Sequence, residues 1–478
     1  MPATPLARAW DRARATPLVF VVIGLAFVVL RLVVALSVRR TFGDFPDSST
    51  YRQATTGPEY SYLSLAGNAM RPFAVPLLYA VLPNDGARVA AQFVLSVAGW
   101  LTLAGVVASV LRDRRVRVAG FVTILLFGCT YLVTTWDFAI ASESLTITLG
   151  VFAVAAWLRF GVGPTVGSAS AVVMTTTLWM FTRAQAFPLV LLLALVVGLW
   201  SIRGDGRARK LTVAGLLVLV AAWGFASVRN QEHSYAARNG QGVGIFSETF
   251  AVNLRFRILP DAAATAWFVE HGMPAPTGLE GHQRSTLAED DWAGWPAFFD
   301  TYRANAELTQ WVDDHGQQAL ARYVLTHPAK MARQFGGDLP DVMVPDRASV
   351  AYVDSPTVLG PLDALLTPYA GTGIPGLPAL WLLGACVVML LVVRGRPVAR
   401  PVLVVAGALL VTSLAGTFLG WLGSPVEFAR HALPFTLFVP IGLTLVLLTL
   451  VDAAVQPREA RHDDAHRERS AAALEPQP

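Results

Sequence analysis

Long apolar segments without charge, separated by short arginine-rich connections, constrain this chain more than any other feature. A helix that crosses a bilayer needs about 20 consecutive apolar residues, and several segments here have that length. Only 15% of the residues are charged, whereas ordinary soluble domains carry about 25%. The pattern therefore predicts an all-α polytopic membrane protein with about ten transmembrane helices.

The connections between these segments predict the orientation of the chain. We place the spans at 17–38, 88–111, 118–135, 138–158, 164–182, 185–201, 211–228, 377–393, 401–421 and 432–453. The first follows a basic tail and is expected to be an uncleaved signal anchor. With a cytoplasmic N-terminus, the arginine-rich connections after spans two, six and eight and the C-terminal tail all fall on the cytoplasmic side, as the positive-inside rule requires. Only two of the 37 basic residues are lysine, which suggests a bacterial genome of high GC content and hence the plasma membrane of a bacterium.

This topology divides the chain into two membrane modules and an outer region. The predicted units are an N-terminal module at 1–228 with a first outer loop at 39–87, an extracytoplasmic region at 229–376, a C-terminal module at 377–453 and a disordered cytoplasmic tail at 454–478. Residues 72–82 are too short to span and are expected to form an interfacial or re-entrant helix. The outer region is expected to be helical over 296–310, 311–326 and 328–335.

Aromatic residues are dense in the extracytoplasmic region. They include Trp267, Trp292, Trp295, Phe298, Phe299 and Trp311. Such residues anchor proteins at membrane interfaces or form a small helical core. A glycan-stacking surface is the functional alternative.

Ionisable residues near the ends of the spans gather on the predicted outer side. They are Asp44, Asp47, Arg71, Asp137, Glu143, Arg183, Glu427, Arg430 and His431. Charged groups at membrane depth are expensive and usually functional. The distribution predicts a cavity that opens outward and is lined by carboxylates and arginines.

Each of these residues also has a structural interpretation. Glu143, placed one and a half turns into the fourth span, must find a partner or shift its pKa. Arg183 or Arg430 could pair with it, either at a binding site or as an ion pair that locks two helices. Asp44 and Asp47 lie in a turn made by glycine and proline, where aspartate often caps a turn or a helix without any chemistry.

Four short motifs, in this order, resemble the GT-C class of membrane glycosyltransferases, including the protein mannosyltransferase and aminoarabinose transferase families. An outer-loop aspartate follows the first span with a tyrosine four residues on, Asp47-Ser-Ser-Thr-Tyr51. Arg71-Pro then precedes the interfacial segment that ends at Tyr79, and Ser142 to Leu145 open an outer helix end. The pattern Glu427, Arg430, His431 and Pro434 opens the last span.

The resemblance implies a polyprenyl-phosphate-linked sugar as donor and inversion at the anomeric carbon. The catalytic aspartate of the family would correspond to Asp47, with Asp44 as the alternative. Many relatives carry a second acid directly after that aspartate, but here the neighbour is Ser48. This departure leaves open whether a divalent cation is bound. The candidates for contact with substrate are Tyr51, Arg71, Asp137, Glu143, Arg183, Glu427, Arg430 and His431, with Arg430 the best candidate for the donor phosphate.

The predicted function is therefore transfer of a sugar, on the outer side of the membrane, to an envelope glycan, a lipid or a protein. A flippase or transporter of lipid-linked sugars and a non-catalytic scaffold of the same fold are the alternatives. Transporters often contain internal repeats and broken helices near the midplane, and no repeat is visible here. Nucleic acid is not an expected partner, because the net charge of +4 is small for this length and the topology accounts for the arginines.

Overall fold

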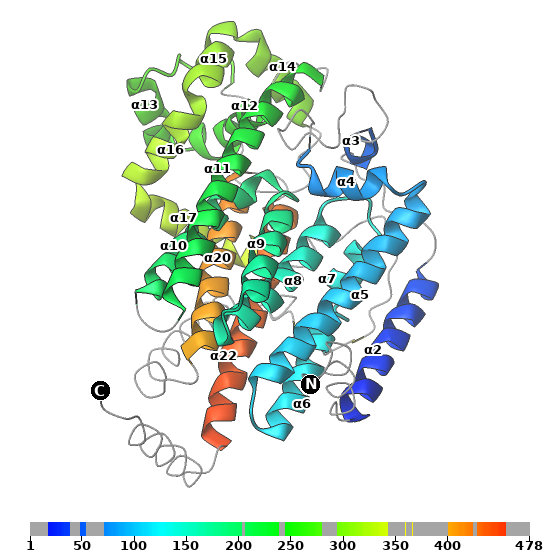
Figure 1. Cartoon of the computed structure of the whole chain (residues 1–478). Coiled ribbons are helices and arrows are strands. Elements are labelled where there is room, and N and C mark those ends of the chain that lie inside the picture. The colour runs from blue at the N-terminus through cyan, green and yellow to red at the C-terminus, as the bar shows by residue number, and fades with distance from the viewer. Residues whose placement is uncertain are drawn as a thin grey trace, which may run out of the picture.

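The computed structural model describes residues 18–38, 48–53, 71–202, 206–238, 244–279, 294–342, 359, 366, 400–423 and 428–455. Every regular element in these residues is a helix. They form a bundle of long helices with a lobe of shorter helices on one end (Figure 1). The prediction of an all-α polytopic membrane protein is confirmed at this level.

Seven helical segments in the described residues are long and apolar enough to cross a membrane. They lie in α2 (Leu18–Ser37), α5 (Asp85–Val110), α8 (Glu143–Val162), η1 with α10 (Ala184–Ala186, Phe187–Ser201), α11 (Arg207–Arg238), α20 (Arg400–Gly423) and α21 with α22 (Phe428–Thr436, Phe438–Val455). The predicted span 164–182 forms α9 (Val166–Met180), which has only 15 residues. The predicted span 377–393 lies outside the described residues. Ten spans are therefore not established.

The predicted span 118–135 is wrong as a single helix. It divides into α6 (Arg114–Phe127) and α7 (Tyr131–Trp136), which are 14 and 6 residues long. The break occurs at Gly128, where an added Cβ would lie 2.7 Å from the Trp100 ring. The Gly128 carbonyl accepts a hydrogen bond from Arg31 at 2.6 Å, so a side chain of another helix satisfies a backbone group that the break leaves free.

The next predicted span, 138–158, also begins later than expected. Helix α8 starts at Glu143, so this carboxylate lies in the first turn and not one and a half turns into the helix. Residues 137–142 form turns before it. The outer segment 72–82 is helical only over α4 (Ala74–Ala80), which agrees with the expectation of a helix too short to span.

The lobe, defined here as residues 244–342, contains six α-helices in its described part. They are α12 (Ile245–Asn253), α13 (Ala262–Glu270), α14 (Trp295–Ala304), α15 (Ala306–Trp311), α16 (Gln317–Thr326) and α17 (Pro328–Val342), with π-helical turns at η2 (Leu254–Ile258) and η5 (Val312–Gly316). The predicted helix 296–310 is two helices, because Asn305 ends α14 and its side chain caps α15. The predicted helix 311–326 consists of the π-helical turn η5 followed by α16, and the predicted helix 328–335 is the first part of α17.

Aromatic residues form the core of the lobe, which supports the expectation of a small helical core. Phe298 is fully buried and Phe299 nearly so. Trp267, Trp295 and Trp311 pack partly buried against the same cluster. Trp292 lies outside the described residues. Burying a large apolar side chain contributes roughly 1.5–3 kcal/mol where water is the alternative environment, so these residues stabilise the lobe.

The lobe is fixed to the end of α20. Trp421 donates a hydrogen bond from its indole nitrogen to Asp338 of α17 at 2.8 Å. Arg257 of η2 lies 3.8 Å from the centre of the Trp421 ring and donates to the Trp421 carbonyl at 2.6 Å. One apolar cluster also contains residues from both parts, such as Phe250 of the lobe and Trp136 of the bundle. The apolar core therefore continues from the bundle into the lobe.

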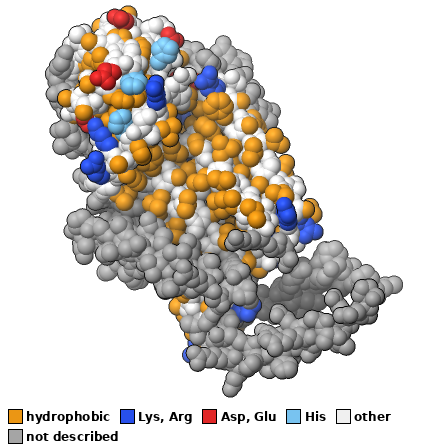
Figure 2. Space-filling model, turned by 90° about the vertical axis from the view of Figure 1, so that its left-hand side faces the viewer, with side chains coloured by type: hydrophobic (Ala, Val, Ile, Leu, Met, Phe, Trp, Pro, Cys, Tyr) orange, Lys and Arg blue, Asp and Glu red, His pale blue; other side chains and the backbone are white. Residues whose placement is uncertain are grey.

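The exposed side chains of the lobe and of the bundle differ in chemistry. In one side view, apolar side chains cover the bundle, whereas histidine and charged side chains gather on the lobe (Figure 2). Exposed leucine and valine side chains on α2, α10 and α11 contribute to the apolar surface. At the end of the bundle opposite the lobe, Asp452 of α22 accepts hydrogen bonds from the backbone of Arg112 and Asp113. Helix α3 (Ser48–Gln53) lies at the lobe end beside α4.

Candidate functional site

One buried carboxylate binds two arginines at the lobe end of the bundle. Glu143 is fully buried, and its Oε1 accepts from Arg183 at 2.5 Å and from Arg430 at 2.8 Å. Both predicted partners therefore pair with it at once. Three elements meet here: the first turn of α8, the connection between α9 and α10, and α21. Glu143, Arg183 and Arg430, called here the Glu143 cluster, thus join three separate segments through one carboxylate oxygen.

A cavity of about 380 Å³ opens beside the Glu143 cluster. Small-molecule sites typically occupy about 300–1,000 Å³. Arg71, Arg183 and Arg430 line it, with Tyr51 and His431. The lobe and α11 supply a neutral wall. That wall includes Val228, Gln231, Ile245, Phe246, Thr249, Phe250, Gln317 and Leu320. The cavity thus has a cationic side in the bundle and an uncharged side in the lobe, among the residues described.

Two buried polar atoms at the cavity lack hydrogen-bond partners. They are Nε of Arg183, a donor, and Oε1 of Gln185, an acceptor. Gln185 lies in η1, two residues after Arg183, and both line the cavity. A buried polar group without a partner costs about 1–3 kcal/mol. A bound polar molecule would satisfy both atoms.

Arg71 completes the cationic side from the first outer loop. Its guanidinium lies 5.0 Å from the centre of the Tyr51 ring, and its Nε donates to Thr50 at 2.8 Å. The contact with the aromatic face orients the guanidinium of Arg71. Tyr51, Arg71, Arg183, Arg430 and His431 were all predicted from the sequence, and the structure brings these five to one cavity.

Other predicted residues are placed elsewhere or not described. Asp137 is buried and pairs with Arg31 of α2, and it does not line the cavity. Asp44, Asp47 and Glu427 lie outside the described residues. The described part of the chain contains no group of three His, Cys, Asp or Glu side chains suited to a metal ion. The possible divalent cation stays a prediction, since both candidate aspartates are among the residues not described.

The sequence analysis missed Arg31 and Gln185. Arg31 is a single charge in the otherwise apolar run of α2, and that isolation is the signal that could have identified it. Gln185 follows Arg183 in a short connection. Nothing in its local sequence indicates that its side chain faces a cavity.

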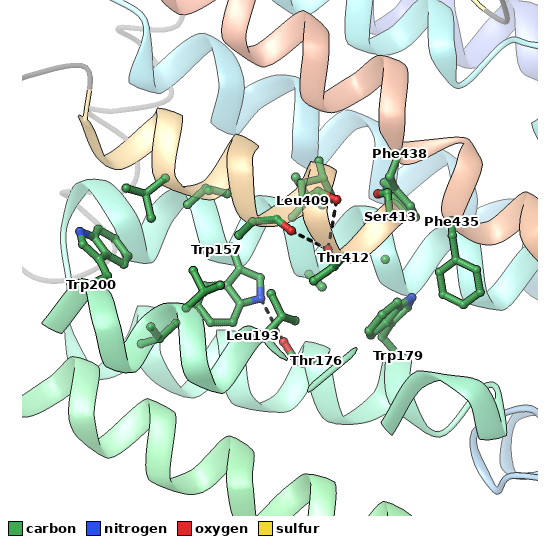
Figure 3. Close-up of a pocket in the computed structure, with 18 residues that line it drawn as sticks. Trp157, Thr176, Trp179, Leu193, Trp200, Leu409, Thr412, Ser413, Phe435 and Phe438 are labelled. Carbon is green, nitrogen blue, oxygen red and sulfur yellow. Dashed lines mark hydrogen bonds between the residues drawn. The ribbon is translucent and has the colours of Figure 1, made fainter. Parts of the chain in front are cut away.

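A second cavity, the apolar crevice, lies within the bundle (Figure 3). Its volume is about 60 Å³ and its aromatic lining comprises Trp157, Trp179, Trp200, Phe435 and Phe438. Two hydroxyl groups of its lining form hydrogen bonds within the protein: Thr176 accepts from the Trp157 indole at 3.2 Å, and Thr412 donates to the Ala408 carbonyl at 2.7 Å. No charged residue is among its lining residues.

The crevice and the cavity share helices. Trp179 precedes Arg183 by four residues at the end of α9, and Phe435 follows Arg430 by five residues along α21. The crevice therefore lies farther from the lobe than the Glu143 cluster does. A cavity with arginines on one side at the end of the bundle and an apolar crevice inside it suit the two parts of an amphipathic molecule.

No protein-family model, curated protein or solved structure matches the chain. The functional assignment consequently rests on the residues and their geometry.

Proposed function

We propose that this protein is a membrane glycosyltransferase that moves a sugar from a polyprenyl-phosphate-linked donor to an envelope glycan, a lipid or a protein. One observation carries the proposal: two arginines share the single carboxylate of Glu143 beside a third arginine, in a cavity at one end of an apolar bundle. Such a site favours an anion attached to a lipid, because guanidinium groups bind phosphate through charge-assisted hydrogen bonds. The apolar crevice would hold part of the polyprenyl chain.

The proposed reaction uses the cationic side for the leaving group. An acceptor hydroxyl attacks the anomeric carbon, the new carbon–oxygen bond forms, and the bond from that carbon to the phosphate oxygen breaks. The lipid phosphate leaves with the electron pair, and Arg183, Arg430 and Arg71 stabilise its charge. The proton of the hydroxyl passes to a base, for which the sequence resemblance indicates Asp47. A positioned general base typically accelerates transfer by about 10²–10⁴-fold.

The positive-inside rule orients the site in the proposal. Basic residues of the α5–α6 connection and the start of α11 include Arg112, Arg114, Arg115, Arg117, Arg207, Arg209 and Lys210. Asp452 contacts the first of these connections at the end opposite the lobe. Such clusters favour the cytoplasm, so the lobe and the cavity would face outward from the plasma membrane of a bacterium.

The proposal is tested by mass spectrometry of lipid-linked sugars and envelope glycans. Wild type is compared with a deletion strain, and with the deletion complemented by Arg430→Ala, Asp47→Ala or Arg333→Ala. Arg333 is an exposed arginine of the lobe outside the cavity lining and serves as the matched control. We expect the first two variants to lose one glycosyl residue from an envelope product and to accumulate its polyprenyl-phosphate donor, whereas Arg333→Ala restores the wild-type profile.

The same experiment distinguishes transfer from the alternatives. If Arg430→Ala and Asp47→Ala both restore the wild-type profile, the catalytic proposal fails. If the protein is a flippase, the donor that accumulates in the deletion strain stays on the inner face of the membrane, where periodate added to sealed vesicles does not reach it. If the protein is a transferase, the accumulated donor lies on the outer face and periodate oxidises it.

A further inference from the structure

The sequence position of Arg31 is unusual, because it is the one charged residue of α2. Only three residues of that helix are buried, namely Phe27, Arg31 and Val34. The guanidinium donates to the Gly128 carbonyl at 2.6 Å, to Ser96 at 3.3 Å and to the carboxylate of Asp137. A charge buried this deeply persists when it is paired and hydrogen-bonded. Arg31 therefore ties a peripheral helix to the interior of the bundle.

The carboxylate of Asp137 continues this chain of contacts to the candidate site. Its second oxygen accepts from the hydroxyl of Ser144 at 2.8 Å. Ser144 directly follows Glu143 in the first turn of α8. The contacts thus run from Arg31 through Asp137 to Ser144, and end one residue from the carboxylate that binds Arg183 and Arg430.

The turns between Asp137 and Glu143 are held by other buried side chains as well. Gln92 donates to the carbonyls of Asp137 and Ala139 at 3.2 and 3.0 Å, and Ser48 donates to the Ile140 carbonyl at 2.7 Å. Gln92 lies in α5 and Ser48 in α3, so two different helices supply these contacts. Because the backbone of this segment is fixed on several sides, the start of α8 has little freedom to shift.

We infer that Arg31 and Asp137 form a positioning pair, which acts through Ser144 to hold Glu143 where one carboxylate oxygen can receive both arginines. The inference rests on the proposed function, since the arrangement it protects is the phosphate site. Arg31 and Asp137 balance each other, and neither lines the cavity, so the pair touches no ligand. Glu143 accepts at 2.5 and 2.8 Å from the connection after α9 and from α21, and a displacement of a few tenths of an ångström would lengthen one of these bonds.

The decisive variant removes the hydrogen bond between Asp137 and α8 and keeps the ion pair of Asp137 with Arg31. Ser144→Ala removes the hydroxyl that joins Asp137 to α8. Thr148→Val is the matched control, because this buried hydroxyl lies one turn farther along the same helix and has no hydrogen-bond partner. Both full-length proteins are purified in lipid nanodiscs, and the Kd for farnesyl phosphate and the Tm are measured. We expect Ser144→Ala to raise the Kd about tenfold at a temperature where it is folded, while Thr148→Val leaves the Kd unchanged.

A second comparison separates positioning from anchoring of α2. Arg31→Gln combined with Asp137→Asn removes both charges and leaves no unpaired ion, so it is expected to fold. Phe27→Ala weakens the packing of the same helix and removes no hydrogen-bond partner of Asp137. We expect the double variant to raise the Kd and to lower the Tm, whereas Phe27→Ala lowers the Tm alone.

The outcomes distinguish failure of the inference from failure of the proposed function. If the wild-type protein binds farnesyl phosphate and both Ser144→Ala and the double variant keep its Kd, the pair is structural only and the inference is overturned. If the wild-type protein does not bind this prenyl phosphate at all, the proposed function fails and the inference fails with it.

Discussion

Two groups of buried charges lie close together in this bundle and differ in their placement relative to the cavity. Arg31 and Asp137 form a one-to-one pair, with further hydrogen bonds to Ser96 and Ser144. Glu143 instead faces two arginines. Members of both groups are less than 8% exposed. Arg183 and Arg430 line the cavity described above, whereas Arg31 and Asp137 do not.

The difference shows how placement relates to role. A buried ion pair away from the cavity, such as Arg31 with Asp137, can remain in the membrane without a ligand. The Glu143 cluster instead brings guanidinium groups to a cavity with space for an anion, and Nε of Arg183 there lacks a hydrogen-bond partner. Burial and ion pairing alone therefore do not identify a ligand site. The adjacent cavity, with an unsatisfied donor in its lining, does.

The largest expected effect comes from removing the shared carboxylate. Glu143→Gln leaves the guanidinium groups of Arg183 and Arg430 close together with no negative charge between them. Removing one partner of a buried ion pair typically destabilises by about 3–5 kcal/mol. We expect this loss of stability, measured by thermal unfolding, together with a loss of sugar transfer of more than 100-fold, measured with purified protein at a temperature where it is folded.

Asp137→Asn is the comparison variant for that experiment. It also leaves a buried arginine unpaired, so a similar loss of stability is expected. Its transfer activity should fall only about tenfold, because the arginines of the cavity keep their carboxylate. The contrast between the two groups is wrong if Asp137→Asn loses as much transfer activity as Glu143→Gln.

A smaller effect is expected from filling the apolar crevice. Ala408→Leu adds three carbon atoms to a wall of the crevice. We expect it to raise the Kd for a long polyprenyl phosphate about tenfold and to leave that for geranyl phosphate unchanged, because the short chain would not extend so far. Ala222→Leu, on the exposed side of α11, is the control. Equal effects on both ligands would show that the crevice does not hold the chain.

The sequence predicted the elements whose cause is local. Charge-free apolar runs predict α2 and α5, since the length of each run alone decides that it can cross a bilayer. The pairing of Glu143 was also predictable in kind, because a buried carboxylate needs a partner. That both Arg183 and Arg430 supply it depends on residues 40 and 287 positions away, which local patterns do not contain.

The features that the sequence did not predict depend on contacts between distant segments. The break at Gly128 follows from the close approach of Trp100 and from the hydrogen bond with Arg31. The late start of α8 follows from side chains of three other helices that hold the preceding turns. Asp137 was expected at the substrate cavity because it is ionisable and near a helix end. Its actual partner, Arg31, lies 106 residues earlier.

The smallest expected effect concerns an ion pair of the lobe that water reaches. Asp261 and Lys330 pair, and each side chain is about one-quarter exposed. Burial alone would raise the pKa of Asp261, but the hydrogen bond from Lys330 holds it below its usual value. Burial likewise opposes the charge of Lys330, but Asp261 raises the pKa of this ammonium.

These two shifts predict the pH dependence of the pair. A lowered carboxyl pKa gives stability that is present above the usual value and is lost as the pH falls through the lowered one. A raised ammonium pKa gives stability that is lost only as the pH rises through the raised one. Exposed pairs contribute about 0–1 kcal/mol, so Lys330→Met should lower the unfolding free energy by less than about 1 kcal/mol at pH 7. Its difference from wild type should vanish once Asp261 is protonated. A loss comparable with that of Glu143→Gln would show that exposure does not separate this pair from the buried ones.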